Sequence, residues 1–91
     1  MYLHLGQDYI VRTKNVLGIF DIDTTSISKH TRDFLHRAEK SGKVINVTQE
    51  LPKSFIVTTE NSDIKVYISQ ISASTLKKRS GYLDDIKIEK K

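Results

Sequence analysis

The chain has 91 residues, 37% of them apolar, which suffices for one domain with one modest core. It contains no cysteine, which excludes disulfides, thiolate zinc sites and thiol nucleophiles and suits a reducing compartment. Fifteen basic against eleven acidic residues give a net charge of +4, which favours a polyanionic partner.

The N-terminal segment has no feature of an export signal. Residues 1–8 lack both the basic and the apolar region of a signal peptide. No apolar run in the sequence approaches the roughly 18 residues of a membrane span. We therefore expect a cytoplasmic protein without a membrane partner.

The first 23 residues predict three strands. Residues 2–5 and 9–12 alternate between apolar and polar, and the short polar segment between them is typical of a hairpin. Residues 16–23 are apolar on both faces as far as Asp21, which predicts a central strand covered on both sides. Gly18 within this strand is expected to admit a close neighbour.

One long helix is predicted over residues 26–41. Apolar side chains recur there at helical spacing, and basic side chains occupy the opposite face. We expect Thr25 or Ser26 to cap its N-terminus and Gly42 to end it in a left-handed conformation. Two basic residues stand in the last turn, where the helix dipole favours cations.

The rest of the chain predicts three further strands and a short helix. Residues 44–48, 54–58 and 64–68 are rich in β-branched and aromatic side chains. Residues 72–79 favour a helix that Ser72 or Ser74 caps.

The order of these elements predicts an α+β fold. We expect a small, mostly antiparallel sheet of six strands, with the long helix on one face and a short C-terminal helix. Residues 1–80 are expected to form one domain and residues 81–91 a mobile tail. The second face of the sheet is expected to meet solvent, a partner or another subunit.

Basic residues on loops and at a helix terminus are the candidate contacts to a polyanion. Such cations reach phosphates without burying their long side chains. Each of them also fits a plainer role, in a solvated turn or at the favourable end of a helix dipole. The candidates are Arg12, Lys14, Lys53, Lys77, Lys78 and Arg79.

Two other sets of side chains have plainer interpretations. Asp33 and Glu39 interrupt the basic face of the long helix, as is typical of a face that serves solubility; its members are Lys29, Arg32, His36 and Lys40. Aromatic residues on the strands can stack on single-stranded bases, but packing in the core or at a subunit interface is favoured. They are Tyr2, Tyr9, Phe20, Phe55 and Tyr67.

The sequence lacks a constellation for catalysis. Asp21 and Asp23 fall on one side of a strand, where they can in principle hold a divalent cation or act as an acid–base pair, but no third ligand accompanies them. The three histidines show no metal spacing. A glycine-rich phosphate loop and a serine elbow are absent from the sequence. We predict a protein that is not an enzyme and needs no cofactor or metal.

Three segments, in their order and spacing, resemble a known family. They are residues 1–6 (MYLHLG), the hairpin strand that leads into residues 16–22 (VLGIFDI), and residues 71–79 (ISASTLKKR). They are similar to the RemA/RemB family of bacterial extracellular-matrix regulators, in particular to its short RemB-type members. The likeness spans about residues 1–79.

The resemblance implies a LytTR-like DNA-binding domain whose subunits associate into a ring. In the family such a ring engages duplex DNA upstream of biofilm-matrix genes, and a RemA-like paralogue is a candidate to share the assembly. The DNA-facing arginines of RemA lie in two loops, which correspond here to Lys14-Asn15 and Leu51-Pro52-Lys53. Asn15 and the Leu51-Pro52 pair stand where RemA has arginine.

Two functions therefore stay open at this point. The first is an oligomeric transcriptional regulator that binds duplex DNA mainly through phosphates, because several linked subunits multiply a few weak contacts. The second is a ring-forming protein-interaction module that has lost DNA binding. The weak basicity of the two loops is the feature that separates them.

Overall fold

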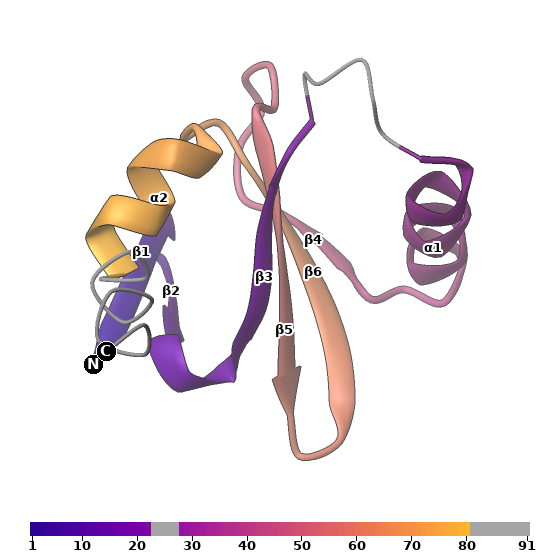
Figure 1. The fold of residues 1–91 in the computed structure, drawn as a ribbon, viewed down its shortest axis with the longest axis horizontal. Coiled ribbons are helices and arrows are strands. Elements are labelled where there is room, and N and C mark those ends of the chain that lie inside the picture. The colour runs from indigo at the N-terminus through magenta and orange to yellow at the C-terminus, as the bar shows by residue number, and fades with distance from the viewer. Residues whose placement is uncertain (23–27, 81–91) are drawn as a thin grey trace, which may run out of the picture.

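The computed structural model describes residues 1–22 and 28–80. Figure 1 shows an α+β fold whose order of elements matches the prediction. The predicted caps Thr25 and Ser26 and the predicted mobile tail lie outside the described residues. The elements are β1 (Tyr2–Gly6), β2 (Tyr9–Arg12), the 3-10 helix η1 (Thr13–Asn15), β3 (Val16–Asp21), α1 (Lys29–Lys40), β4 (Val44–Asn46), β5 (Ser54–Glu60), β6 (Asp63–Ser69) and α2 (Ala73–Ser80).

The strands form two sheets, where a single sheet was expected. β1 and β2 pair as an antiparallel hairpin, and the other four strands form a sheet in the order β3-β5-β6-β4. Pairing in this sheet is antiparallel except between β4 and β6. The prediction of a mostly antiparallel arrangement is therefore confirmed.

The prediction that residues 16–23 form a central, covered strand is wrong. β3 lies at the edge of the four-stranded sheet, and a bulge interrupts its pairing between Val16 and Gly18. Its two apolar faces belong to two different layers, because Ile19 packs into one core while Phe20 stacks on Phe55 of the other face. Gly18 does admit a close neighbour, since the Phe20 ring occupies the space that a Cβ would need.

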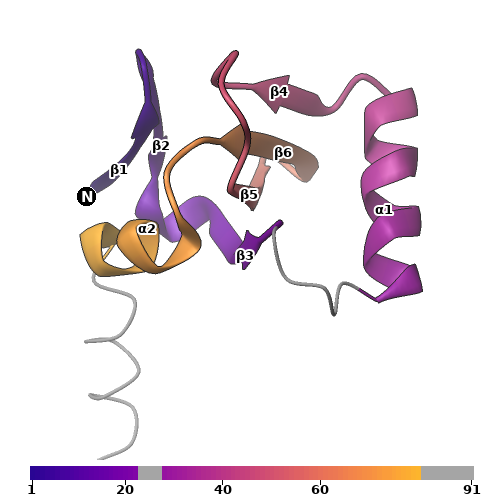
Figure 2. The same cartoon turned by 90° about the horizontal axis from the view of Figure 1, so that it is seen from above.

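Both faces of the four-stranded sheet are covered. In Figure 2, α1 lies on one side of the sheet, while the hairpin and α2 lie on the other. The expectation of one open face is therefore wrong, because the hairpin folds over the sheet as a separate layer. Fully or nearly fully buried side chains under the hairpin and α2 are Leu3, Leu5, Ile19, Val47, Ile56, Ala73 and Leu76. The smaller core under α1 contains Ala38, Phe55 and Val66.

Two buried serines tie the sheet to the hairpin and to the segment before α2. The Ser69 hydroxyl donates to the carbonyl oxygen of Leu5 at 2.7 Å and accepts from the backbone N–H of Ile71 at 3.0 Å. The Ser54 hydroxyl donates to the Ile71 carbonyl oxygen at 2.7 Å. Both serines are fully buried and face each other across β5 and β6. Their bonds partner backbone groups in an interior where an unpaired polar group is costly.

Local capping sets the bounds of the two helices. The hydroxyl of Ser28 accepts from the backbone N–H of Thr31 at 3.1 Å and caps α1 two residues after the predicted start. Gly42 has a φ of +71°, which confirms the predicted left-handed end of this helix. Ser72 caps α2 as predicted, since its hydroxyl accepts from the backbone N–H of Thr75 at 3.3 Å.

Candidate nucleic-acid interface

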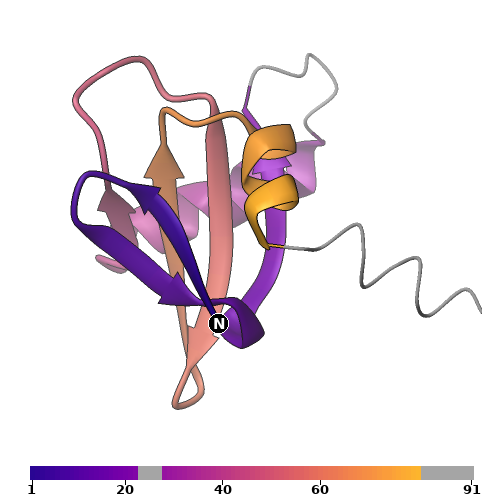
Figure 3. The same cartoon turned by 90° about the vertical axis from the view of Figure 1, so that its left-hand side faces the viewer.

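The first group of predicted contacts lies on and beside η1. Figure 3 shows the hairpin lying across the sheet, with η1 turning the chain from β2 into β3. The side chains of Arg12 and Lys14 are exposed, and Asn15 is half-buried. The backbone N–H of Thr13 donates to the carbonyl oxygen of Met1 at 3.0 Å, which closes the base of the hairpin under this turn. The cations thus stand on a short, hydrogen-bonded connection.

Lys53 stands on the loop before β5, as predicted. Its backbone is held on two sides, because its N–H donates to the Ser69 carbonyl oxygen at 2.8 Å and its carbonyl oxygen accepts from the Ile22 N–H at 2.9 Å. Its side chain is exposed. A fixed backbone with a free cation is suited to a phosphate contact, since less of the loop has to be ordered on binding.

The two loops lie at opposite ends of β3 within one subunit. The strand register pairs Val16, next to η1, with Thr58, and Asp21 with Ser54, next to Lys53. Five residue steps at a strand rise of about 3.3 Å separate these ends by about 17 Å. A duplex that touches both loops of one subunit therefore has to run along β3 and β5.

The basic run of α2 lies nearer to the Lys53 end. Lys77 and Lys78 line a shallow groove of about 440 Å³ between α2 and β3, together with Phe20 and Asp21. Because Asp21 pairs with Ser54, the groove opens close to the loop that carries Lys53. Lys78 and Arg79 are exposed, whereas Lys77 is half-buried. The candidate cations therefore form two separate groups.

Lys65 is a further cation that the sequence analysis did not single out. It lines a cleft of about 230 Å³ with Arg12 and Asn15, between the hairpin and the sheet. In the sequence Lys65 is the polar residue within the apolar run of residues 64–68. This run indicates a strand but does not show which element covers that strand. Only the placement of the hairpin over β6 brings Lys65 to the η1 group.

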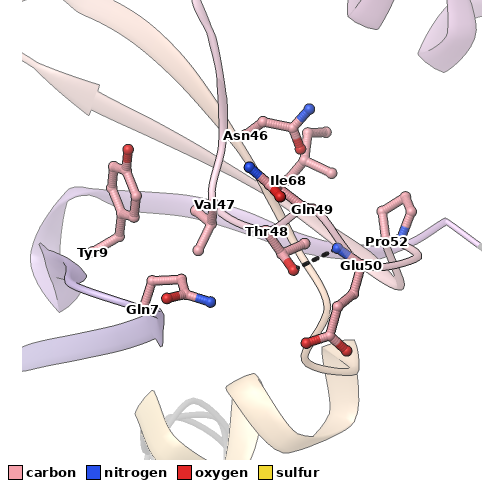
Figure 4. Close-up of a pocket in the computed structure, with 9 residues that line it drawn as sticks. All are labelled: Gln7, Tyr9, Asn46, Val47, Thr48, Gln49, Glu50, Pro52 and Ile68. Atoms are coloured by element: carbon pink, nitrogen blue, oxygen red, sulfur yellow. Dashed lines mark hydrogen bonds between the residues drawn. The ribbon is translucent and has the colours of Figure 1, made fainter.

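A third cleft has a different character. It measures about 950 Å³ and lies between the hairpin turn and the loop before β5 (Figure 4). Amide side chains and Glu50 line it, and none of its lining residues is basic; the backbone N–H of Glu50 donates to the Thr48 hydroxyl at 2.9 Å. Such a lining does not favour a phosphate, so this cleft is no part of the candidate interface.

The predictions on metal sites and membrane spans can be compared with the structure only for the described residues. Asp23 lies outside the described residues, so the structure gives no distance between its carboxylate and that of Asp21. Among residues 1–22 and 28–80, no three His, Asp or Glu side chains are grouped as a metal site requires. In the same part of the chain no helix is long and apolar enough to cross a membrane.

With this geometry in view, comparison with known proteins identifies the family. The RemA-like family, described as extracellular matrix regulatory protein A-like, matches residues 2–79. The chain belongs to this family. The predicted resemblance is confirmed, and the match ends just before α2 does.

A curated relative supports the same assignment. Extracellular matrix regulatory protein B of Bacillus subtilis strain 168 is 38% identical over 86 residues, which cover 94% of this chain and 98% of the relative. The family match over residues 2–79 includes every candidate cation, from Arg12 to Arg79. The family is one of regulators, which supports a regulatory role in extracellular-matrix formation.

Proposed function

We propose that the chain is an oligomeric, cytoplasmic transcriptional regulator of extracellular-matrix genes, without catalytic activity, that binds duplex DNA mainly through phosphates. The observation that supports this most directly is the placement of the exposed cations. Arg12, Lys14 and Lys53 stand on or beside two hydrogen-bonded loops, and none of them forms a salt bridge with a described residue. Unpaired cations on fixed loops are available to phosphates at little conformational cost.

Assembly is part of the proposal because one subunit offers few contacts. Two or three phosphate contacts bind weakly at physiological salt, whereas linked subunits raise the effective concentration of the remaining contacts. We propose a closed ring of identical subunits, which a RemA-like paralogue can share. The mass in solution tests this step: a particle of 10.4 kDa at micromolar concentration contradicts it.

Binding of a fluorescently labelled duplex across a salt series tests the proposed function. We expect binding at ~50 mM salt that weakens steeply as salt rises, with a log–log slope of about −0.9 for each phosphate contact. Duplexes of unrelated sequence are expected to bind with comparable salt slopes. Lys14→Ala and Lys53→Ala weaken binding to all of them, while Lys29→Ala on α1 serves as the matched control. Absence of binding at ~50 mM salt refutes the proposal.

The second candidate is a ring-forming interaction module that does not bind DNA. The residues that replace the arginines of RemA favour it, because Leu51 is 86% exposed and uncharged at the tip of a predicted DNA loop. Exposed apolar side chains of this kind commonly mark contacts with protein. An assembled particle without DNA binding at low salt supports this function over the first.

A further inference from the structure

The cleft between the hairpin and the four-stranded sheet brings together two cations from distant parts of the chain. Lys65 lies on β6 and shares a face with Tyr67 and Ser69 because side chains alternate along a strand. That face points to the hairpin, since Ser69 bonds to Leu5 and the Tyr67 ring meets the Tyr9 ring edge-on at 6.4 Å. Lys65 is thus the residue at which β6 emerges from under the hairpin.

Arg12 lies on the other side of this cleft. It ends β2, directly before η1, and it lines the cleft together with Asn15 and Tyr2. Neither Arg12 nor Lys65 forms a salt bridge with a described residue, and both side chains are exposed. Arg12 and Lys65 therefore line one cleft from two elements, β2 and β6. The guanidinium presents a planar fork of donors, and the ammonium acts as a compact charge.

The size and lining of the cleft favour one small anionic group. Its volume of about 230 Å³ is below the roughly 300 Å³ at which pockets for drug-sized ligands begin. Asn15 and Thr58 add neutral hydrogen-bonding groups. Glu60 also lines the cleft and opposes an anion, so the two cations leave a charge of +1 there. Lys14 carries a further positive charge on η1, next to Asn15 in sequence.

We propose that Arg12 and Lys65 together bind one backbone phosphate of duplex DNA in this cleft. The proposal rests on the proposed function and goes beyond it by assigning Lys65, a strand residue, as a phosphate contact. It also separates this contact from Lys53, which lies about 17 Å away along the strands and meets a different phosphate. Hairpin and sheet then act as the two walls of one phosphate site.

Matched charge substitutions test the cleft with the labelled duplex and the assembled protein. Because both cations contact the same phosphate, the double variant Arg12→Gln/Lys65→Gln lowers the steepness of the salt slope by about 0.9 per engaged subunit. Each single substitution to glutamine lowers it by less and weakens binding, and Lys65→Arg keeps it. Lys29→Gln and Arg32→Gln on α1 are the controls and leave it unchanged. Glu60→Gln removes the opposing carboxylate and tightens binding severalfold. Circular dichroism and the mass in solution confirm that each variant is folded and assembled.

Three results overturn the proposal in distinguishable ways. If the native protein binds DNA and Lys65→Gln binds as Lys29→Gln does, the cleft is not a phosphate site, and the proposed function stands. If Lys65→Gln instead lowers the mass of the particle, the cleft holds an acidic segment of a second copy. If the native protein does not bind DNA at ~50 mM salt, the proposed function fails and the cleft proposal with it. If Lys65→Gln does not fold, the other two variants test the cleft. The proposal then requires that Arg12→Gln weakens DNA binding and that Glu60→Gln tightens it.

Discussion

Removing the Ser69 hydroxyl should loosen the hairpin layer from the sheet. In the native protein this hydroxyl bonds to Leu5 on β1 and to Ile71 before α2, at 2.7 and 3.0 Å. Alanine fills nearly the same space but bonds to neither group. The site is fully buried, so solvent does not replace the lost partners, and each buried polar group left without one costs about 1–3 kcal/mol.

We therefore expect Ser69→Ala to lower the free energy of unfolding by about 2–4 kcal/mol. For a domain of this size a loss of that order shifts the melting temperature by roughly 10–20 °C. Ser54→Ala, which loses one bond, should cost about half as much, and the exposed Ser74→Ala should stay within about 0.5 kcal/mol of the native protein. Urea unfolding at one fixed protein concentration measures all three, because assembly adds to apparent stability.

The comparison also tests how the layers are joined. If Ser69→Ala unfolds at the same urea concentration as Ser74→Ala, these bonds do not hold the hairpin, and the apolar contacts alone do. If the predicted loss is found, Arg12, at the end of the hairpin, depends on Ser69 for its position. The salt slope of DNA binding should then fall in Ser69→Ala even under conditions where the variant stays folded.

Three further substitutions probe the core, the edge strand and the cleft. Leu76→Ala, at a fully buried site, should cost about 2–5 kcal/mol in the same urea experiment, and a loss below 1 kcal/mol would mean that α2 does not seal the core. Gly18→Ala places a Cβ 2.5 Å from the half-exposed Phe20 ring and should displace this ring. We expect the free energy of unfolding to fall by about 1 kcal/mol, and an unchanged value would contradict this. Burial, and then the Glu60 carboxylate, raise the pKa of Tyr67 above 10.0. The folded chain thus holds this proton more tightly than the unfolded chain, so this contribution is present below about pH 10 and is lost as pH rises through the folded pKa. Tyr67→Phe should flatten the fall in stability above about pH 10, and Glu60→Gln should move the tyrosinate titration to lower pH.

Local signals in the sequence account for most of the elements. The β-branched and aromatic side chains of residues 54–58 and 64–68 predicted β5 and β6. Asn61 and Ser62 between them take the positive φ of a tight hairpin turn. Glycine at the end of α1 and serine at the start of α2 marked two helix bounds. Each of these signals acts within a few residues, so neighbouring sequence suffices to predict it.

The layering could not be predicted in the same way. An apolar strand pairs equally well inside a sheet or at its edge, and the choice for residues 16–21 depends on where the hairpin lies. The hydrogen bond from the Ser69 hydroxyl to the Leu5 carbonyl oxygen joins residues 64 apart in sequence and helps to decide that position. For the same reason the sequence predicted the cations on loops but not Lys65. Whether a cation on a strand lines a binding site depends on which element packs against that strand.

Coverage of both sheet faces bears on how the proposed ring would be built. A subunit with an open face associates through that face, but here α1 occupies one face and the hairpin with α2 the other. The apolar groups that stay accessible lie at the edge instead: Leu17 in the bulge of β3 is 61% exposed and Phe20 is 46% exposed. If this edge contacts a different side of the next subunit, the contact joins unlike sides, which is the arrangement that closes into a ring. Leu17→Lys should therefore reduce the mass of the particle while leaving the fold intact, because a charge on an edge opposes strand-to-strand contact. The smaller particles should also bind DNA more weakly, because fewer subunits are linked. If Leu17→Lys keeps the native mass, the subunit interface lies elsewhere.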